Sequence, residues 1–144
     1  MGEQRARDPG DVRRASYRAS DVEPILEAGL LETWEGEREL LPGLVAHQLG
    51  GHSDGVSVVT VEGGGETAIF WSDVVPTTHH VQPAYVMAFD VDVARSFEQR
   101  SLWIERAAQG GWTGLFYHDT EVPFARIRRD ERRYAVEPIA GEPA

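Results

Sequence analysis

The stretch GGHSDGVSVVTVEGGGETAIFWSD, residues 50–73, contains the clearest structural pattern in this 144-residue chain. Two runs rich in β-branched and aromatic residues, 56–61 and 67–71, are separated by a run of glycines, which is typical of a β-hairpin. Glycines also flank the segment around His52 and predict a turn before the first strand. Asp73 directly follows the second strand. The stretch therefore predicts a hairpin with a polar side chain beyond each of its outer ends.

The sequence on either side of this hairpin predicts an α+β domain. Upstream, residues 20–29 are typical of a short helix, and residues 31–49 of two or three short strands. Downstream, residues 92–109 fit a helix whose inward face would be formed by Ala94, Phe97, Ser101, Ile104 and Ala108. A buried strand that ends near His118 and a terminal hairpin follow.

The length and composition limit what kind of protein this is. A chain of 144 residues suits a single domain, and we expect residues 1–19 to form a loose polar segment, 20–140 the domain and 141–144 a tail. The formal charge of −10 argues against nucleic acid or an anionic membrane surface as a partner, because both attract basic surfaces. Without cysteine, any transition metal would be held by His, Asp or Glu.

The hydropathy pattern bears on the location of the protein. No apolar run approaches the ~18 to 20 residues that span a membrane, and the N-terminal sequence lacks the apolar core of a signal peptide. The sequence therefore predicts a cytoplasmic protein with no membrane partner.

Three side chains that can bind metals lie where a predicted strand meets a loop: His52, Asp73 and His118. Two imidazoles and a carboxylate suit Zn, Mn or Fe, and a carboxylate can bridge two ions. Taken singly, each residue also has an ordinary structural interpretation, as a turn histidine, an Asx-turn aspartate and a strand end. The sequence does not fix the strand directions, so whether the three side chains converge stays open here.

The three segments that carry these side chains resemble, in this order, segments of the metallo-β-lactamase fold hydrolases. GHSDG, residues 51–55, resembles the G-H-[ST]-x-G element of that superfamily. AIFWSD, residues 68–73, resembles the strand that ends in the bridging aspartate, with Ser72 where the family commonly has glycine. GLFYHD, residues 114–119, resembles the strand that carries the last histidine ligand. The resemblance extends over residues 15–140 and is greatest to zinc-dependent hydrolases with lactonase-like and organophosphate-hydrolase-like members.

The resemblance implies the second half of an αββα sandwich, with a mixed β-sheet and helices on one face. It implies that His52 serves one metal, that His118 serves a second and that Asp73 bridges them. Zinc is the expected ion, with Mn or Fe as alternatives. The family's leading H-x-H-x-D-H motif is not found around any of the five histidines, so two ions would be held only if the missing first half is supplied.

The implied activity is metal-dependent hydrolysis of an ester, a lactone or a phosphoester, with a metal-bound hydroxide as the nucleophile. His79, His80 and Tyr85, in the apolar and irregular loop 74–90, are candidates for lining the substrate pocket, although a histidine pair in a loop is often simply exposed to solvent.

The missing motif leaves the role of the chain itself open. The chain is expected to be inactive or weakly active alone, as a truncated or split C-terminal half whose partner is a separately encoded N-terminal half or a second copy. The alternatives are a non-catalytic remnant or interaction module that keeps the half-fold, and an unrelated β-rich binding domain in which the three side chains lie far apart.

Overall fold

The computed structural model describes residues 18–139 and divides the chain into two compact units, residues 1–35 and 36–144. In the first unit, helix α2 spans Ala19–Glu27, as predicted, and the chain leaves it through Gly29, whose φ is +67°. A glycine in this left-handed conformation is the usual way to end a helix. Most of the predicted loose segment 1–19 and the whole tail 141–144 lie outside the described residues.

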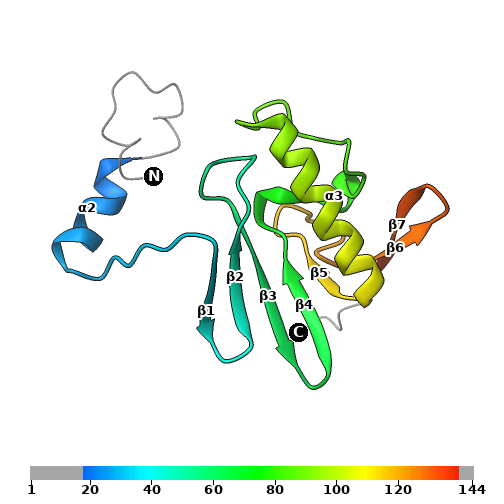
Figure 1. The fold of residues 1–144 in the computed structure, drawn as a ribbon, viewed down its shortest axis with the longest axis horizontal. Coiled ribbons are helices and arrows are strands. Elements are labelled where there is room, and N and C mark those ends of the chain that lie inside the picture. Colours follow the sequence, from blue (N-terminus) through cyan, green and yellow to red (C-terminus); the bar gives the residue numbers. More distant parts are fainter. Residues whose placement is uncertain (1–17, 140–144) are drawn as a thin grey trace. The chain divides into compact units, whose positions relative to one another are not determined.

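The second unit is built on a mixed sheet of seven strands that follow one another in chain order (Figure 1). Neighbouring strands are antiparallel throughout, except that β4 and β5 are parallel. The predicted α+β class is therefore confirmed. The strands are β1 (Glu37–Leu41), β2 (Leu44–Gln48), β3 (Ser57–Gly63), β4 (Glu66–Phe70), β5 (Thr113–Leu115), β6 (Phe124–Asp130) and β7 (Arg133–Pro138).

The hairpin predicted from residues 56–71 is present as β3 and β4. Two residues, Gly64 and Gly65, make its turn, and both have positive φ values, of +62° and +82°. Two consecutive positive φ angles match the right-handed twist of the flanking strands, and glycine adopts them without a steric penalty. The turn is thus one glycine shorter than the GGG run suggests, since Gly63 still pairs with Glu66 in the ladder.

Helix α3 (Val93–Gly110) connects the parallel strands β4 and β5 and covers one face of the sheet (Figure 1). Asp92 caps its first turn by accepting a hydrogen bond from the main-chain N–H of Arg95, and Gly111, at φ +63°, ends it. Parallel neighbours need a long crossover of this kind, because a tight turn cannot join them. Within residues 18–139, no helix combines the length and apolarity needed to cross a bilayer.

The predicted inward face of α3 is wrong in most of its residues. Phe97 is 49% exposed, and of the predicted set only Ile104 is fully buried. The reason is that the packed face carries a charged side chain and a serine, which a search for apolar periodicity counts as polar. The buried residues of the helix are Ser96, Arg100, Trp103, Ile104 and Ala107.

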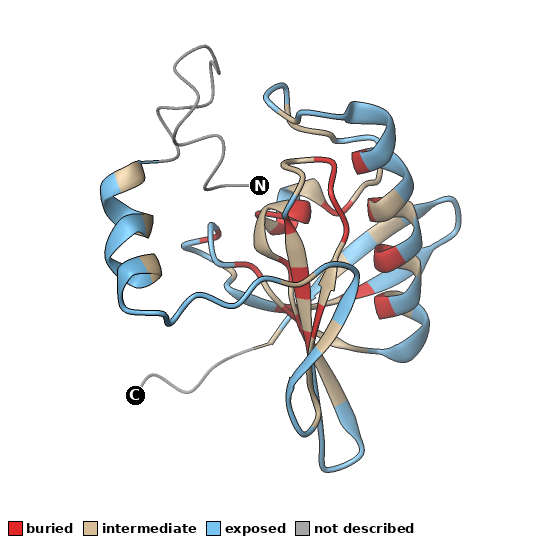
Figure 2. Ribbon diagram, turned by 60° about the vertical axis from the view of Figure 1, so that its left-hand side comes forward, coloured by how far each residue is buried: buried red, intermediate tan, exposed pale blue. Residues whose placement is uncertain are grey.

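The hydrophobic core lies between α3 and the sheet face that it covers, where Figure 2 shows the buried residues gathered. Alternate residues of the central strands point to this side, so Val58, Ile69 and Ala125 are fully buried there. Trp71 and Phe116, just beyond β4 and β5, stack with their ring centroids 6.2 Å apart. The core therefore extends past the strand ends and supports the loops that follow them.

Arg100 is a fully buried charge on the core side of α3, with 1% of its surface exposed. Its guanidinium group donates hydrogen bonds to main-chain carbonyls of the irregular segment 74–83, namely those of Val74, His80, Gln82 and Pro83. Burial lowers the pKa of Arg100 to about 10, and the negative charge of Asp90 opposes that change. The side chain thereby supplies the donors that a loop without regular structure cannot provide for itself.

We expect Arg100→Met to lower the free energy of unfolding by about 3 kcal/mol or more, because it leaves buried carbonyls without donors. Arg106→Met, on the exposed side of the same helix over the ring of Trp103, should cost less than about 1 kcal/mol. Urea denaturation of both variants measures the difference. Equal losses would contradict the role given to the buried guanidinium group.

Candidate metal centre

The sheet topology brings the three predicted ligands to one edge. Asp73 and His118 follow β4 and β5, which run parallel, so both lie beyond the carboxyl ends of neighbouring strands. His52 lies in the turn before β3, and β3 is antiparallel to β4, so this turn is at the same edge. The strand directions that the sequence leaves open therefore make the three positions converge.

The side chains meet around the carboxylate of Asp73. The Nε2 atom of His118 lies 3.0 Å from Asp73 Oδ1, and the Nε2 atom of His52 lies 3.6 Å from Asp73 Oδ2. Each imidazole thus faces a different oxygen of one carboxylate. The structure therefore brings all three predicted ligands together around the residue predicted to bridge.

Tyr117 is a further contact of Asp73 that the sequence did not suggest. Its hydroxyl donates a 2.7 Å hydrogen bond to Asp73 Oδ1, and the centroid of its ring lies 3.9 Å from that of the His118 ring. Partial burial, and then the bonded carboxylate, raise the pKa of Tyr117 to about 12, so its proton stays available to Asp73. A tyrosine next to a candidate ligand is too common for the sequence to have singled it out.

Asp90 is a second contact that the sequence did not suggest, on the other nitrogen of His52. Its Oδ1 lies 2.9 Å from His52 Nδ1, and its side chain is 2% exposed. The two residues are 38 positions apart, and only the folded loop 81–92 brings them together. The one available signal was an acidic residue inside an apolar loop, shortly before the helix cap at Asp92.

Asp119 holds the segment after His118 in place. It accepts hydrogen bonds from the main chain and hydroxyl of Thr78 and from the N–H groups of Glu121 and Val122. Burial alone would raise the pKa of Asp119, but these four donors outweigh it and lower the pKa to about 2. The carboxylate therefore ties the loop beyond β5 to the loop that carries His80.

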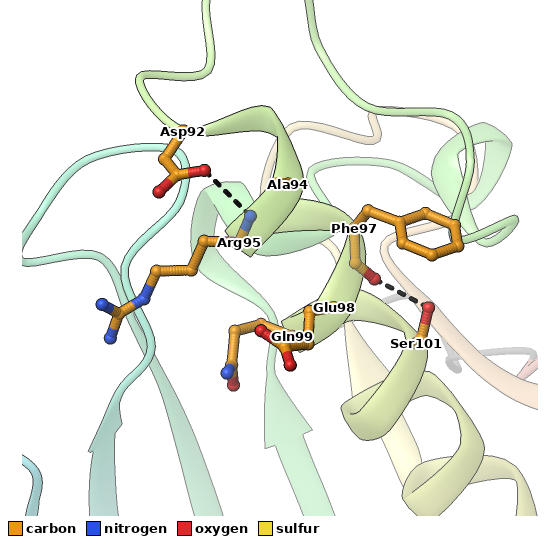
Figure 3. A pocket seen from close by; sticks show the side chains of 7 residues that line it. All are labelled: Asp92, Ala94, Arg95, Phe97, Glu98, Gln99 and Ser101. Atoms are coloured by element: carbon orange, nitrogen blue, oxygen red, sulfur yellow. Dashed lines mark hydrogen bonds between the residues drawn. The ribbon is translucent and has the colours of Figure 1, made fainter.

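The turn that carries His52 is packed tightly against the start of α3. Gly51 has a φ of +100°, and a Cβ placed there would lie 2.8 Å from the main-chain nitrogen of Ser96. Arg95 extends from the helix to donate a hydrogen bond to the carbonyl of Leu49, and Figure 3 shows that side chain beside the Asp92 cap. Ser72, beside Asp73, has a φ of +51°, a conformation in which glycine is unstrained.

A cavity of about 690 Å³ opens beside the three candidate ligands. Its lining is apolar at Pro76 and residues 86–89, and polar at Thr77, His80 and the three candidate ligands. His80 receives support from Thr77, whose Oγ1 lies 2.8 Å from the ring Nδ1. Burial, and then the charge of Arg100, lower the pKa of His80, which favours a neutral ring in the cavity.

The other two pocket candidates lie elsewhere. His79 is exposed and Tyr85 is 49% exposed, and neither is among the residues that line this cavity. A second hollow, of about 700 Å³, lies along the exposed side of the first turns of α3 (Figure 3). Its lining includes Phe97 and Glu98, and none of the three candidate ligands lies in it.

The donor set fits part of a metal centre. Two imidazoles and a carboxylate are suitable ligands for zinc and similar ions. Within residues 18–139, however, no three His, Cys, Asp or Glu side chains are placed to hold one ion together. His52 and His118 approach different oxygens of Asp73, so the arrangement suits two ions that share this carboxylate rather than one ion held by all three.

Solved structures of several hydrolases share this fold. A probable metal-dependent hydrolase from Staphylococcus aureus matches 92% of this chain and 48% of its own, with a TM-score of 0.75 and 25% identity. The hydrolase AbOPH of the beta-lactamase superfamily matches 99% of this chain and 52% of its own, with a TM-score of 0.77 and 19% identity. AidC, a dizinc quorum-quenching lactonase, matches 92% of this chain and 46% of its own, with a TM-score of 0.73 and 15% identity.

The chain spans about half the length of each of these proteins. Its fold is therefore that of about half of each of these hydrolases, which confirms the resemblance and agrees with the expected C-terminal half. No protein-family model matches the chain, and neither does any curated protein sequence.

Gly51→Ala should lower the free energy of unfolding by about 3 kcal/mol or more, since the new methyl group collides with the main chain of Ser96 in addition to the left-handed strain. Gly64→Ala is the matched control: its φ is also positive, at +62°, but nothing lies within 4 Å of the new Cβ. That variant should lose only about 1 kcal/mol. Thermal or urea denaturation compares them, and similar losses would show that the contact with α3 does not matter.

Proposed function

We propose that this chain contributes one half of a two-metal hydrolytic centre that acts on an ester, a lactone or a phosphoester. The observation that carries the proposal is the position of Asp73, with His52 and His118 beside its two oxygens, at a cavity with a partly apolar lining. Small substrates commonly bind in cavities of this kind, where a few polar groups converge against an apolar surface. The metal-dependent hydrolases that share the fold add independent support.

In this proposal His52 and Asp73 hold one ion, and His118 and Asp73 hold the other. Zinc is the expected metal, with manganese or iron as alternatives, because imidazole and carboxylate serve all three. Ions of this type polarise the oxygen of the scissile group and make water more acidic. The chain's own contribution is to fix the bridging carboxylate, which Tyr117 hydrogen-bonds, and to present the cavity to the substrate.

The remaining ligands would come from a complementary half of the same fold, joined to this chain or separate from it. Two ligands per ion are fewer than the three protein ligands of known catalytic zinc sites. The sheet face opposite α3 offers a surface for that half, because Leu41, Val61 and Phe124 are 64%, 46% and 44% exposed there. Exposed apolar side chains spread over one face of a sheet favour a protein contact.

A second candidate function is a non-catalytic interaction module that keeps the half-fold. The observation in its favour is that, across residues 18–139, no three donors are placed to hold one ion. In that case the same sheet face would still bind a partner, and the convergence of Asp73 with the two histidines would remain from a lost site.

Zinc binding by the chain distinguishes the two functions. We expect zinc to raise the melting temperature of the wild-type protein. Asp73→Ala should abolish this rise, because Asp73 would be a ligand of any ion held beside His52 or His118. His79→Ala is the matched control, since His79 is exposed and outside the cavity, and it should respond as the wild type does. Differential scanning fluorimetry measures the shifts. An equal response of the Asp73→Ala variant would favour the interaction module.

Hydrolysis should appear only in a complex with a complementary half that carries H-x-H-x-D-H. Val61→Glu should weaken that complex by about tenfold or more, because it buries an unpaired charge at the contact. Leu102→Glu, at a similarly exposed position on α3, should leave the complex intact. Co-purification and hydrolysis of an ester and lactone panel with added zinc or manganese are the measurements. No hydrolysis by an intact complex would count against an enzymatic role.

A further inference from the structure

We propose that Asp90 is the positioning residue of His52: it holds the imidazole in the tautomer with the proton on Nδ1 and directs Nε2 toward Asp73 and the cavity. The proposal deepens the proposed function and rests on it, because the direction of Nε2 matters only if that nitrogen binds a ligand.

The hydrogen bond itself specifies the tautomer. Asp90 Oδ1 lies 2.9 Å from His52 Nδ1, and an ionised carboxylate can only accept, so Nδ1 must donate. In a neutral ring the lone pair then lies on Nε2, the nitrogen that is 3.6 Å from Asp73 Oδ2. The imidazole is therefore prepared to donate its lone pair on the side of the cavity.

The two carboxylates beside His52 differ in exposure. The side chain of Asp73 is 28% exposed and lines the cavity, whereas that of Asp90 is 2% exposed and is not part of the lining. Asp90 also acts on Arg100, whose pKa its negative charge raises against the effect of burial. A buried carboxylate between a histidine and an arginine can orient the ring, but it is out of reach of a substrate.

Main-chain hydrogen bonds fix Asp90 relative to the ring. The N–H of Val91 donates to the carbonyl of His52 at 3.3 Å, and the N–H of Asp92 donates to the carbonyl of Gly51 at 2.9 Å. Phe89, which precedes Asp90 in the sequence, contacts the His52 ring edge-on, with 5.7 Å between the ring centroids. The main-chain bonds hold the backbone of His52 next to the segment that carries Asp90, and Phe89 contacts the ring itself.

The expected consequence is a stronger ligand. A carboxylate that accepts the distal N–H of a metal-binding histidine fixes the ring and raises the basicity of the other nitrogen, and its loss typically weakens metal binding about 10- to 100-fold. Asp90 is thus expected to act on metal affinity through His52 without touching the metal itself.

The test measures the tautomer directly, by long-range ¹H–¹⁵N NMR of the His52 ring in the metal-free full chain, at a pH where the ring is neutral. The wild type should show the proton on Nδ1. Asp90→Leu, of similar shape but without an acceptor, should move the proton to Nε2. Glu37→Leu is the matched control, since it removes the carboxylate beside Nδ1 of His47, outside the cavity, and should leave His52 unchanged. If Asp90→Leu does not fold, Asp90→Asn should give a mixture of tautomers, because its amide can either accept or donate.

A second measurement is zinc affinity by competition with a chromophoric chelator. Asp90→Leu, or Asp90→Asn in its place, should weaken this affinity relative to the wild type and to Glu37→Leu. A wild-type ring protonated on Nε2 would overturn the proposal, as would an unchanged tautomer in the folded Asp90 variant or an unchanged zinc affinity. A wild type that binds no zinc would instead overturn the proposed metal centre, while the tautomer would still decide the role of Asp90.

Discussion

The parallel pairing of β4 and β5 is the constraint on which the rest of the structure depends. Ala68, Ile69 and Phe70 pair with Thr113, Gly114 and Leu115, and this short ladder is the only parallel one among the described strands, residues 37–138. Parallel pairing requires a long crossover, which is supplied by the loop after Asp73 and by α3. It also places the residues that follow both strands at one edge of the sheet, where Asp73 meets His118.

The crossover loop is held by buried charges. Residues 72–92 contain only two short 3₁₀ turns, so their main-chain groups need partners from elsewhere. Arg100 donates to the carbonyls of this loop, Asp119 accepts from Thr78, and Asp90 Oδ1 lies 2.9 Å from Nδ1 of His52. Burying a charge is favourable only when it is well hydrogen-bonded, so these contacts give the cavity wall a defined shape.

The two faces of the sheet differ in a way that agrees with half of a larger fold. One face forms the core under α3, while apolar side chains such as Val61 and Phe124 are exposed on the other. The matched hydrolases are about twice as long as this chain. The candidate metal centre is incomplete in the same way as the exposed sheet face, because the groups around Asp73 suit two ions but supply few ligands to each. In the proposed function, a complementary half completes both the sheet face and the donor set.

Local sequence determined the β3–β4 hairpin, the limits of α3 and the residue types at the candidate centre, because glycine turns, a helix cap and metal-binding side chains are properties of short segments. The packed face of α3 was predicted wrongly, since Arg100 is buried by its bonds to loop carbonyls rather than by apolar character. Only the tertiary structure decided that His52, Asp73 and His118 converge and that Asp90 supports His52. These contacts join residues 21 to 45 positions apart, and their formation depends on strand directions and on a crossover that no local pattern specifies.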